Sequence, residues 1–264
     1  MNVMFLMDYH LHSEFSDDCT APLRAQLEAA QAAGLTEVCF TDHIDFDGVG
    51  LLPADLGARD AAIEALRGDF PGITIRRGAE VGLKDAVSAS QSFAFCEKRN
   101  LDFIIASVHI VQGVDAYCPA FFDGRTQAEI YAGYLAWAAQ ILPTYSYFNV
   151  LGHYDFCAKF APYSNRAFRY SHASEALDSL FRQLVAAGKG MEVNTSAWRE
   201  DPAWGLDVLR RYRTLGGEFV TVGSDAHQPQ RVGRRIKEAL DLARAAGISY
   251  VATFQAMQPT FYRL

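Results

Sequence analysis

The 264-residue sequence lacks the short motifs that mark several common enzyme classes. It contains no GxSxG, no GxxxxGK[ST] and no GxGxxG pattern. These absences disfavour serine hydrolases, P-loop NTPases and dinucleotide-binding enzymes. The five cysteines are odd in number and form no CxxC pair. A disulfide scaffold is therefore not expected, and reduced thiols in a cytoplasmic protein are the simplest interpretation.

Long apolar runs and basic runs are also missing. No apolar stretch approaches the ~20 residues that would span a bilayer. The opening MNVMFLM is too short for the apolar part of a signal peptide and has no basic flank. The formal net charge is −7, and no run of Lys and Arg occurs, which argues against a nucleic-acid surface. We expect no membrane and no nucleic-acid partner, and the oligomeric state stays open.

Short apolar runs alternate with helix-like stretches from one end of the chain to the other. The first expected strand ends at His12. The next six are expected at 37–41, 73–79, 103–108, 148–151, 191–194 and 219–222, and a last one at 250–254. The expected helices cover 21–33 (N-capped by Thr20), 55–66, 85–98, 127–142, 173–187, 204–214 and 229–246. This order is typical of parallel strands in a β/α barrel or an open α/β sheet. No linker interrupts it, so one domain over residues 1–264 is expected.

The seven apolar runs end on residues of the types that bind metals. In β/α barrels the active site forms at the C-terminal ends of the strands. Six of the seven histidines stand at these ends, and only His172 does not. The sequence therefore predicts a ring of imidazoles and carboxylates around one mouth, made by His10, His12, His43, Glu80, His109, His153, Asp225 and His227.

Two pairs of these residues have a spacing that suits binding of one cation by both members. His10 and His12, and likewise Asp225 and His227, are two residues apart, and alternate residues of a strand point to the same side. Glu80 directly follows a buried run and is interpreted as a carboxylate that bridges two cations. Asp17 or Asp18 lies close enough after His12 to fold back onto the site.

The motifs DYHLHSEFSDD, FTDH, GAEVGL, ASVH, GHYDF, EVNTS and GSDAH resemble, in this order and spacing, those of the PHP (polymerase and histidinol phosphatase) family. The resemblance covers nearly the whole chain and implies a distorted (β/α)7 barrel with three cations at its mouth. It implies a first cation held by His10, His12, Glu80 and Asp225, a second by Glu80, His109 and His153, and a third by His43, His227 and Asp18. Asp17 is the alternative to Asp18.

Six imidazoles and three carboxylates suit Zn, Mn or Fe rather than Mg or Ca. Three divalent ions against three carboxylates leave a charge of about +3, which suits a phosphate dianion in an acidic protein. Adjacent cations also lower the pKa of a bridging water, so a metal-bridging hydroxide would attack phosphorus without a protein nucleophile. The catalytic residues would then be Glu80, Asp225, His227 and Arg199.

Arg199, at the tip of the sixth strand, is the best-placed donor to phosphate, and the resemblance implies a phosphate contact for it. Lys159 and Arg166 are weaker candidates for substrate binding. Within the family, the chain most resembles stand-alone histidinol-phosphate phosphatases. This implies hydrolysis of the small metabolite L-histidinol phosphate, a step of histidine biosynthesis. The alternatives are a phosphatase for another small metabolite or for phosphotyrosine, or a non-catalytic or proofreading module that partners a polymerase.

Overall fold

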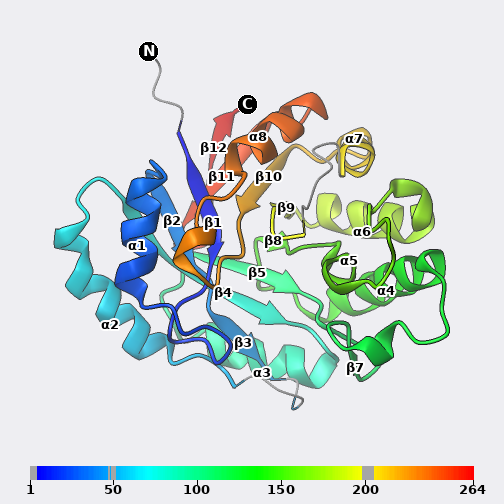
Figure 1. Cartoon of the computed structure of the whole chain (residues 1–264), viewed down its shortest axis with the longest axis horizontal. Helices are drawn as coiled ribbons and strands as arrows, with labels where there is room; N and C mark the ends of the chain where they lie inside the picture. The colour runs from blue at the N-terminus through cyan, green and yellow to red at the C-terminus, as the bar shows by residue number, and fades with distance from the viewer. Residues whose placement is uncertain (1–4, 47, 49–51, 198–204) are drawn as a thin grey trace.

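Seven parallel strands form the body of this computed structural model, which describes residues 5–46, 48, 52–197 and 205–264 (Figure 1). The sheet order is β1-β2-β4-β5-β8-β9-β10, and β10 returns to β1 through a bridge between Leu11 and Ala226. The His12 amide donates to the Ala226 carbonyl at 3.1 Å, and the Asp225 amide donates to the His10 carbonyl at 2.8 Å. The closed but irregular ring confirms the distorted (β/α)7 barrel. Its strands are β1 (Met7–Leu11), β2 (Glu37–Phe40), β4 (Thr74–Gly82), β5 (Phe103–Ser107), β8 (Val150–Leu151), β9 (Gly190–Asn194) and β10 (Phe219–Gly223).

Five shorter or outer strands complete the sheets. Strand β3 (His43–Asp45) runs parallel to the end of β4, and β6 (Ile110–Val111) pairs with β7 (Val114–Asp115) as a hairpin. Strand β11 (Tyr250–Gln255) confirms the expected last strand and pairs with β10. The antiparallel strand β12 (Gln258–Arg263) was not expected from the sequence.

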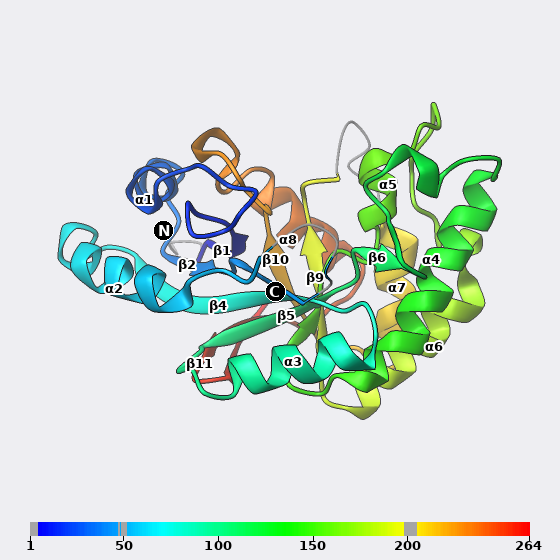
Figure 2. The same ribbon diagram turned by 90° about the horizontal axis from the view of Figure 1, so that it is seen from below.

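Eight helices among the described residues surround the strands (Figures 1 and 2). Two begin with reciprocal capping bonds, in which Asp85 pairs with Ser88 and Thr126 pairs with Glu129. The expected Thr20 cap is wrong, because the first helix begins later, and the Glu14 carboxylate accepts from the Leu23 amide instead. The helices are α1 (Leu23–Ala32), α2 (Leu56–Leu66), α3 (Ala86–Cys96), α4 (Gln127–Ile141), α5 (Phe156–Phe160), α6 (Ser174–Ala186), α7 (Leu206–Thr214) and α8 (Ile236–Ala245).

The last helix also begins later than the sequence predicts. Residues Pro229–Arg231 form a 3-10 turn, and Gly233 and Arg235 have positive φ values of 70° and 58°. The buried Asp8 carboxylate accepts from the Gly233 amide at 2.9 Å. This bond from β1 holds the turn, so the helix begins only at Ile236.

The seven barrel strands are buried along most of their length, and apolar side chains from them and the helices form one core. The loops that follow β1 and β10 lie on the same side of the barrel (Figure 2). No helix in the described ranges is long and apolar enough to cross a membrane.

Candidate metal centre

Parallel strands bring the predicted ligands to one mouth of the barrel. His10 lies in β1, Glu80 in β4, and His43 opens β3. His109, His153 and Asp225 lie one or two residues beyond β5, β8 and β10. All but Asp18 and His227 in the predicted set have at most about an eighth of their side chain exposed. A mouth buried to this degree holds charges away from bulk water.

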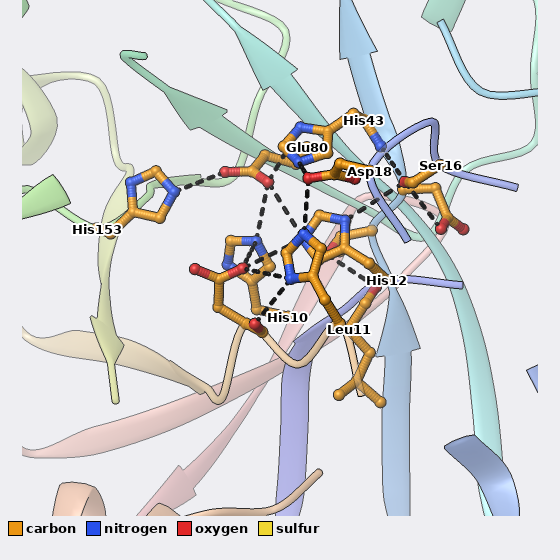
Figure 3. Close-up of polar contacts among 12 residues, drawn as sticks. His10, Leu11, His12, Ser16, Asp18, His43, Glu80 and His153 are labelled. Carbon is orange, nitrogen blue, oxygen red and sulfur yellow. Dashed lines mark hydrogen bonds and ion pairs between the residues drawn. The ribbon is translucent and has the colours of Figure 1, made fainter. Parts of the chain in front are cut away.

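Glu80 lies at the centre of the cluster (Figure 3). Its side chain is 1% exposed, and its two oxygens face five imidazole nitrogens that come from β1 and its end, from β3, and from the ends of β5 and β8. The distances are 2.8 Å to His153 Nε2, 3.0 Å to His10 Nε2, 3.3 Å to His109 Nε2, 3.4 Å to His12 Nε2 and 3.4 Å to His43 Nδ1. One carboxylate therefore touches both sides of the mouth.

Asp225 and Asp18 complete two further groups. Asp225 Oδ1 lies 3.4 Å from His12 Nε2 and 3.8 Å from His10 Nε2. Asp18 Oδ2 lies 2.9 Å from His227 Nε2 and 3.5 Å from His43 Nε2. Asp17 points elsewhere, because its carboxylate accepts from the Leu52 amide at 2.9 Å. The structure thus brings Asp18, and not Asp17, into the cluster.

The buried carboxylates stay ionised. Burial tends to raise the pKa of Glu80, but the neighbouring His10 holds it well below its usual range. Burial acts in the same way on Asp225, where Lys159 and then His10 keep the pKa well below its usual range. Lys159 Nζ lies 2.5 Å from Asp225 Oδ2. The mouth therefore carries fixed negative charge that demands a cationic partner.

The imidazoles divide into two sets. Burial tends to lower the pKa of five of them, His10, His12, His43, His109 and His153. Around His10, His43 and His109 the carboxylates outweigh burial and raise the pKa, and for His10 and His43 it lies well above the ordinary value. For His12 and His153 burial prevails and the pKa is lowered. Protons on the first set balance the carboxylates in the protein alone, which is the role a divalent cation would take.

Buried atoms without hydrogen bonds test whether the residues fit such cations. Within the described part of the chain, His12 Nε2, Glu80 Oε1 and both carboxylate oxygens of Asp45 make no hydrogen bond. Glu80 Oε1 nevertheless lies only 2.8 Å from His153 Nε2, so the two atoms face a common point rather than each other. Buried polar atoms left unpaired in this way are costly, and lone pairs that converge on one point suit a metal ion.

Four groups of side chains each place their ligand atoms within 4.8 Å of one another. Three overlap in part with the ligand sets that the resemblance implied, but His10, and not His109, joins Glu80 and His153. The fourth adds Asp45, which lies 3.1 Å from His43 Nδ1 and 3.9 Å from His109 Nδ1. The groups are His12, Asp18, His43 and His227; His10, His12 and Asp225; His10, Glu80 and His153; and His43, Asp45 and His109. The donor set is built to bind divalent metal ions.

Sequence reasoning missed Asp45 and Glu192. Asp45 follows His43 by two residues on β3, the same spacing that singled out His10 and His12. Glu192 stands on β9, 1% exposed, with Oε1 2.7 Å from His10 Nδ1. For Glu192, the signal in the sequence was the motif EVN on the sixth strand: Glu192 and Asn194 are two residues apart, so their side chains lie on one face of the strand.

A polar network behind the metal mouth holds the loop that follows β1. The Asp42 Oδ1 atom accepts from the Ser13 amide at 2.7 Å, the Ser13 hydroxyl at 2.9 Å and the Ser16 hydroxyl at 3.1 Å. Ser16 Oγ in turn accepts from the His43 amide at 3.0 Å and lies 3.4 Å from His12 Nδ1 (Figure 3). These contacts join two ligand-bearing segments.

A cavity of about 580 Å³ opens directly onto the cluster. Two segments that the sequence predicts to be long loops along the substrate, 110–125 and 155–171, supply part of its wall, including Asp115, Tyr117 and Phe160. The ring centroids of Tyr117 and Phe160 lie 4.2 Å apart. These loops carry the β6–β7 hairpin and helix α5, which the sequence did not predict. A volume of this size suits a small metabolite.

The three predicted cationic contacts have different positions. Lys159 lines the cavity, beside Asp225. Arg166 is not among the lining residues, and its guanidinium donates to the Lys159 carbonyl at 3.0 Å. Arg199 lies outside the described residues. Arg231, which sequence reasoning missed, also lines the cavity.

The model of the PHP domain family matches residues 8–196 of this sequence. The chain belongs to the PHP domain family. Among curated relatives, a histidinol-phosphatase of Lactococcus lactis subsp. lactis is 32% identical, over 96% of this chain and 95% of the relative. A probable histidinol-phosphatase of Deinococcus radiodurans is 30% identical, over 96% of this chain and 99% of the relative.

One solved PHP structure matches the whole fold. It is a crystal structure of histidinol phosphate phosphatase from Lactococcus lactis subsp. lactis complexed with zinc, L-histidinol and phosphate. The TM-score is 0.90 at 31% identity, and the match covers 97% of this chain and 98% of that one. The resemblance that the sequence motifs indicated is confirmed.

Proposed function

We propose that this protein is a metal-dependent phosphomonoesterase that hydrolyses L-histidinol phosphate to L-histidinol and phosphate. The convergence of ten ligand-type side chains at one mouth of the barrel, eight of which line the cavity, carries the proposal. The nearly full-length similarity to histidinol-phosphatases supports the choice of substrate. The product L-histidinol places the reaction in histidine biosynthesis.

Three divalent cations, chosen from Zn, Mn and Fe, would occupy the centre. His10, His12, Glu80 and Asp225 would hold the first, and Glu80, His109 and His153 the second. His43, His227 and Asp18 would hold the third. Contacts of 2.8–3.4 Å from Glu80 to imidazoles on both sides support its role as the shared carboxylate.

When bound, the cations would supply Lewis-acid chemistry, activating water and neutralising the phosphoryl oxygens. The protein's own part is to hold the phosphate and shield the mouth. Lys159 lines the cavity and would donate to a phosphoryl oxygen, and Arg199 would add a planar two-pronged contact. Neither residue would need to act as a nucleophile, because water activated by bound cations would supply one.

The histidinol part of the substrate would lie against the outer wall of the cavity. Tyr117 and Phe160 offer aromatic surface there, and Asp115 offers a carboxylate. L-Histidinol carries an ammonium group and an imidazole ring, which match a carboxylate and a pair of tilted aromatic rings respectively. This wall distinguishes the substrate from a phosphate ester without positive charge.

A substrate panel tests the proposal. Metal-stripped protein is reconstituted separately with Zn, Mn or Fe, and phosphate release is measured from L-histidinol phosphate, other small phosphorylated metabolites and phosphotyrosine. We expect kcat/KM to be highest for L-histidinol phosphate. A higher value for phosphotyrosine or another metabolite would overturn the substrate, and no release with any metal would overturn the enzymatic role.

A further inference from the structure

Glu192 makes three contacts that leave its carboxylate no freedom. It is 1% exposed on β9. Its Oε1 atom lies 2.7 Å from His10 Nδ1, while Oε2 accepts from the His153 amide at 3.0 Å and from Asn194 Nδ2 at 3.1 Å. Both oxygens are thus engaged on the side of the ligands that faces away from the cavity.

Gly223 on β10 makes room for this carboxylate. A Cβ atom at that position would lie 2.3 Å from Glu192 Oε1 and 2.4 Å from His10 Cβ, which no real side chain tolerates. The tip of β10 therefore packs closely against the pair of Glu192 and His10. Close packing of this kind keeps a ring in one orientation.

The hydrogen bond decides which nitrogen of His10 faces the cluster. A carboxylate next to Nδ1 requires a proton on that atom, so the neutral ring keeps its lone pair on Nε2. His10 Nε2 lies 3.0 Å from Glu80 Oε2 and 3.8 Å from Asp225 Oδ1 (Figure 3). The lone pair therefore points to the place where the first cation would lie.

A second chain of contacts continues from Glu192 along the same face of β9 and beyond its end. Asn194 donates to Glu192 and accepts from the Ser196 hydroxyl at 2.6 Å. That hydroxyl also lies 3.0 Å from Asp225 Oδ2. The residues at positions 192, 194 and 196 thus connect the back of His10 with the back of Asp225.

We propose that Glu192 is a positioning residue of the metal centre. It fixes His10 in the tautomer that ligates through Nε2, and it anchors the backbone of His153 at the neighbouring cation. The inference rests on the proposed metal assignment of His10 and His153, and it deepens that assignment by adding the carboxylate behind them. Carboxylates behind ligating histidines raise metal affinity by roughly 10- to 100-fold.

The decisive variant is Glu192→Gln, which keeps the size and removes the charge. Two donors, the His153 amide and Asn194 Nδ2, face one end of the side chain, so the amide oxygen turns toward them. The amide NH2 then faces His10 Nδ1 and forces the tautomer with the proton on Nε2. That tautomer has no lone pair for the cation.

The experiment titrates metal-stripped, full-length protein with Zn²⁺ in competition with a chromophoric chelator. We expect Glu192→Gln to bind at least one Zn²⁺ about 10- to 100-fold more weakly than the unmodified protein. At saturating Zn²⁺ the KM for a generic aryl phosphate should stay unchanged. Equal affinity in the variant would overturn the proposal.

Asp102→Asn is the matched control. Asp102 is 8% exposed and accepts from the Arg77 and Ala256 amides at 3.0 Å each, just before β5 and thus at the other end of the barrel. The Asp102→Asn variant also loses a buried negative charge, but position 102 is remote from the metal ligands, so the Zn²⁺ affinity should not change. Equal weakening in both variants would mean general destabilisation and would also overturn the proposal.

A measurement on the unmodified protein covers the case in which Glu192→Gln does not fold. Nitrogen-15 NMR of histidines in the Zn²⁺-loaded protein should show His10 ligated through Nε2, with a proton on Nδ1. Ligation through Nδ1 would overturn the inference. These readouts need no substrate, so a failure to hydrolyse L-histidinol phosphate would contradict the proposed function alone.

Discussion

At the scale of single residues, Glu80 concentrates the chemistry of the site. Among the residues that the structure describes, it is the one side chain whose oxygens reach five of the ligand imidazoles within 3.4 Å. Its burial makes an uncompensated charge there expensive. A buried carboxylate in this position needs cations around it to compensate its charge. Replacing Glu80 therefore tests whether metal ions bind here.

Replacing Glu80 by Ala should remove the shared ligand of two cations. We expect bound metal to fall below the unmodified protein's content and activity to drop by several orders of magnitude, while the fold survives because the ligands line the rim. Elemental analysis and circular dichroism check both parts. Glu37→Ala is the control, because Glu37 is also a buried glutamate but lies beside Arg76 and Tyr9 at the start of β2. Near-normal turnover of the Glu80→Ala variant would refute the bridging role.

Arg199 lies outside the described residues, and its phosphate contact stays a prediction. Loss of a charge-assisted, two-pronged contact costs roughly 2–4 kcal/mol, or ~30- to ~1000-fold in kcat/KM. Arg199→Ala should lower kcat/KM by this factor on both L-histidinol phosphate and an aryl phosphate, with metal content intact. Arg199→Lys should recover part of the activity.

Arg166→Ala separates the two arginines. Its guanidinium holds the Lys159 carbonyl and does not line the cavity, so we expect a smaller loss than for Arg199→Ala. The reverse order would place Arg166 at the phosphate. An effect of Arg199→Ala confined to L-histidinol phosphate would move Arg199 to the leaving-group side.

At the scale of elements, helix α2 is tied to the barrel by a buried ion pair. Arg59 and Asp42 are both 0% exposed and lie 3.4 Å apart. Arg59 Nη1 also donates to the Phe40 carbonyl of β2 at 3.2 Å and the Gly78 carbonyl of β4 at 2.7 Å. Because Asp42 holds Ser13 and Ser16, this one guanidinium supports the loop that carries His12 and Asp18.

Arg59→Met should therefore cost more than an ordinary surface change. Removing one partner of a buried pair strands the other charge, and a loss of about 3–5 kcal/mol in the free energy of unfolding is expected. Urea denaturation of the metal-free protein measures it. Arg182→Met is the control, because Arg182 is 61% exposed and its ion pair with Asp178 should contribute only about 0.3–0.5 kcal/mol. Similar losses of stability in both variants would contradict the role of Arg59.

At the scale of the whole molecule, metal binding and protonation compete for the same atoms. In the metal-free protein the surrounding carboxylates raise the pKa values of His10, His43 and His109 against the effect of burial, which favours their protonated forms. A cation must displace those protons from the atoms it binds. Charge balance of the mouth is therefore kept by protons or by metal.

Metal affinity should consequently rise with pH through and above neutrality. Raised pKa values mean that the metal-free form is stabilised by protons at low pH and loses that stabilisation as pH increases. Each displaced proton changes the affinity by about tenfold per pH unit. Calorimetric titration with Zn²⁺ in buffers of different ionisation enthalpy measures the protons released; affinity that does not vary with pH would contradict the assignment.

Several features of this protein were determined by the sequence alone. The alternation of apolar runs with helical stretches predicted parallel strands of a β/α barrel or an open α/β sheet, because each strand and helix buries its own residues in a local, periodic pattern. The resemblance of the motifs to the PHP family then implied the barrel. The ligand-type residues were also readable, since parallel strands bring their ends to one mouth whatever the details of packing. His10, His43, Glu80 and Asp225 were identified on this ground.

Other features were decided only by the tertiary structure. The choice of Asp18 over Asp17 depends on the Leu52 amide, and the late start of α8 depends on Asp8 from the first strand. Glu192 meets His10 across 182 residues of sequence. Such pairs have no local pattern, because their partners come together only when the barrel closes and buried polar groups must find hydrogen bonds.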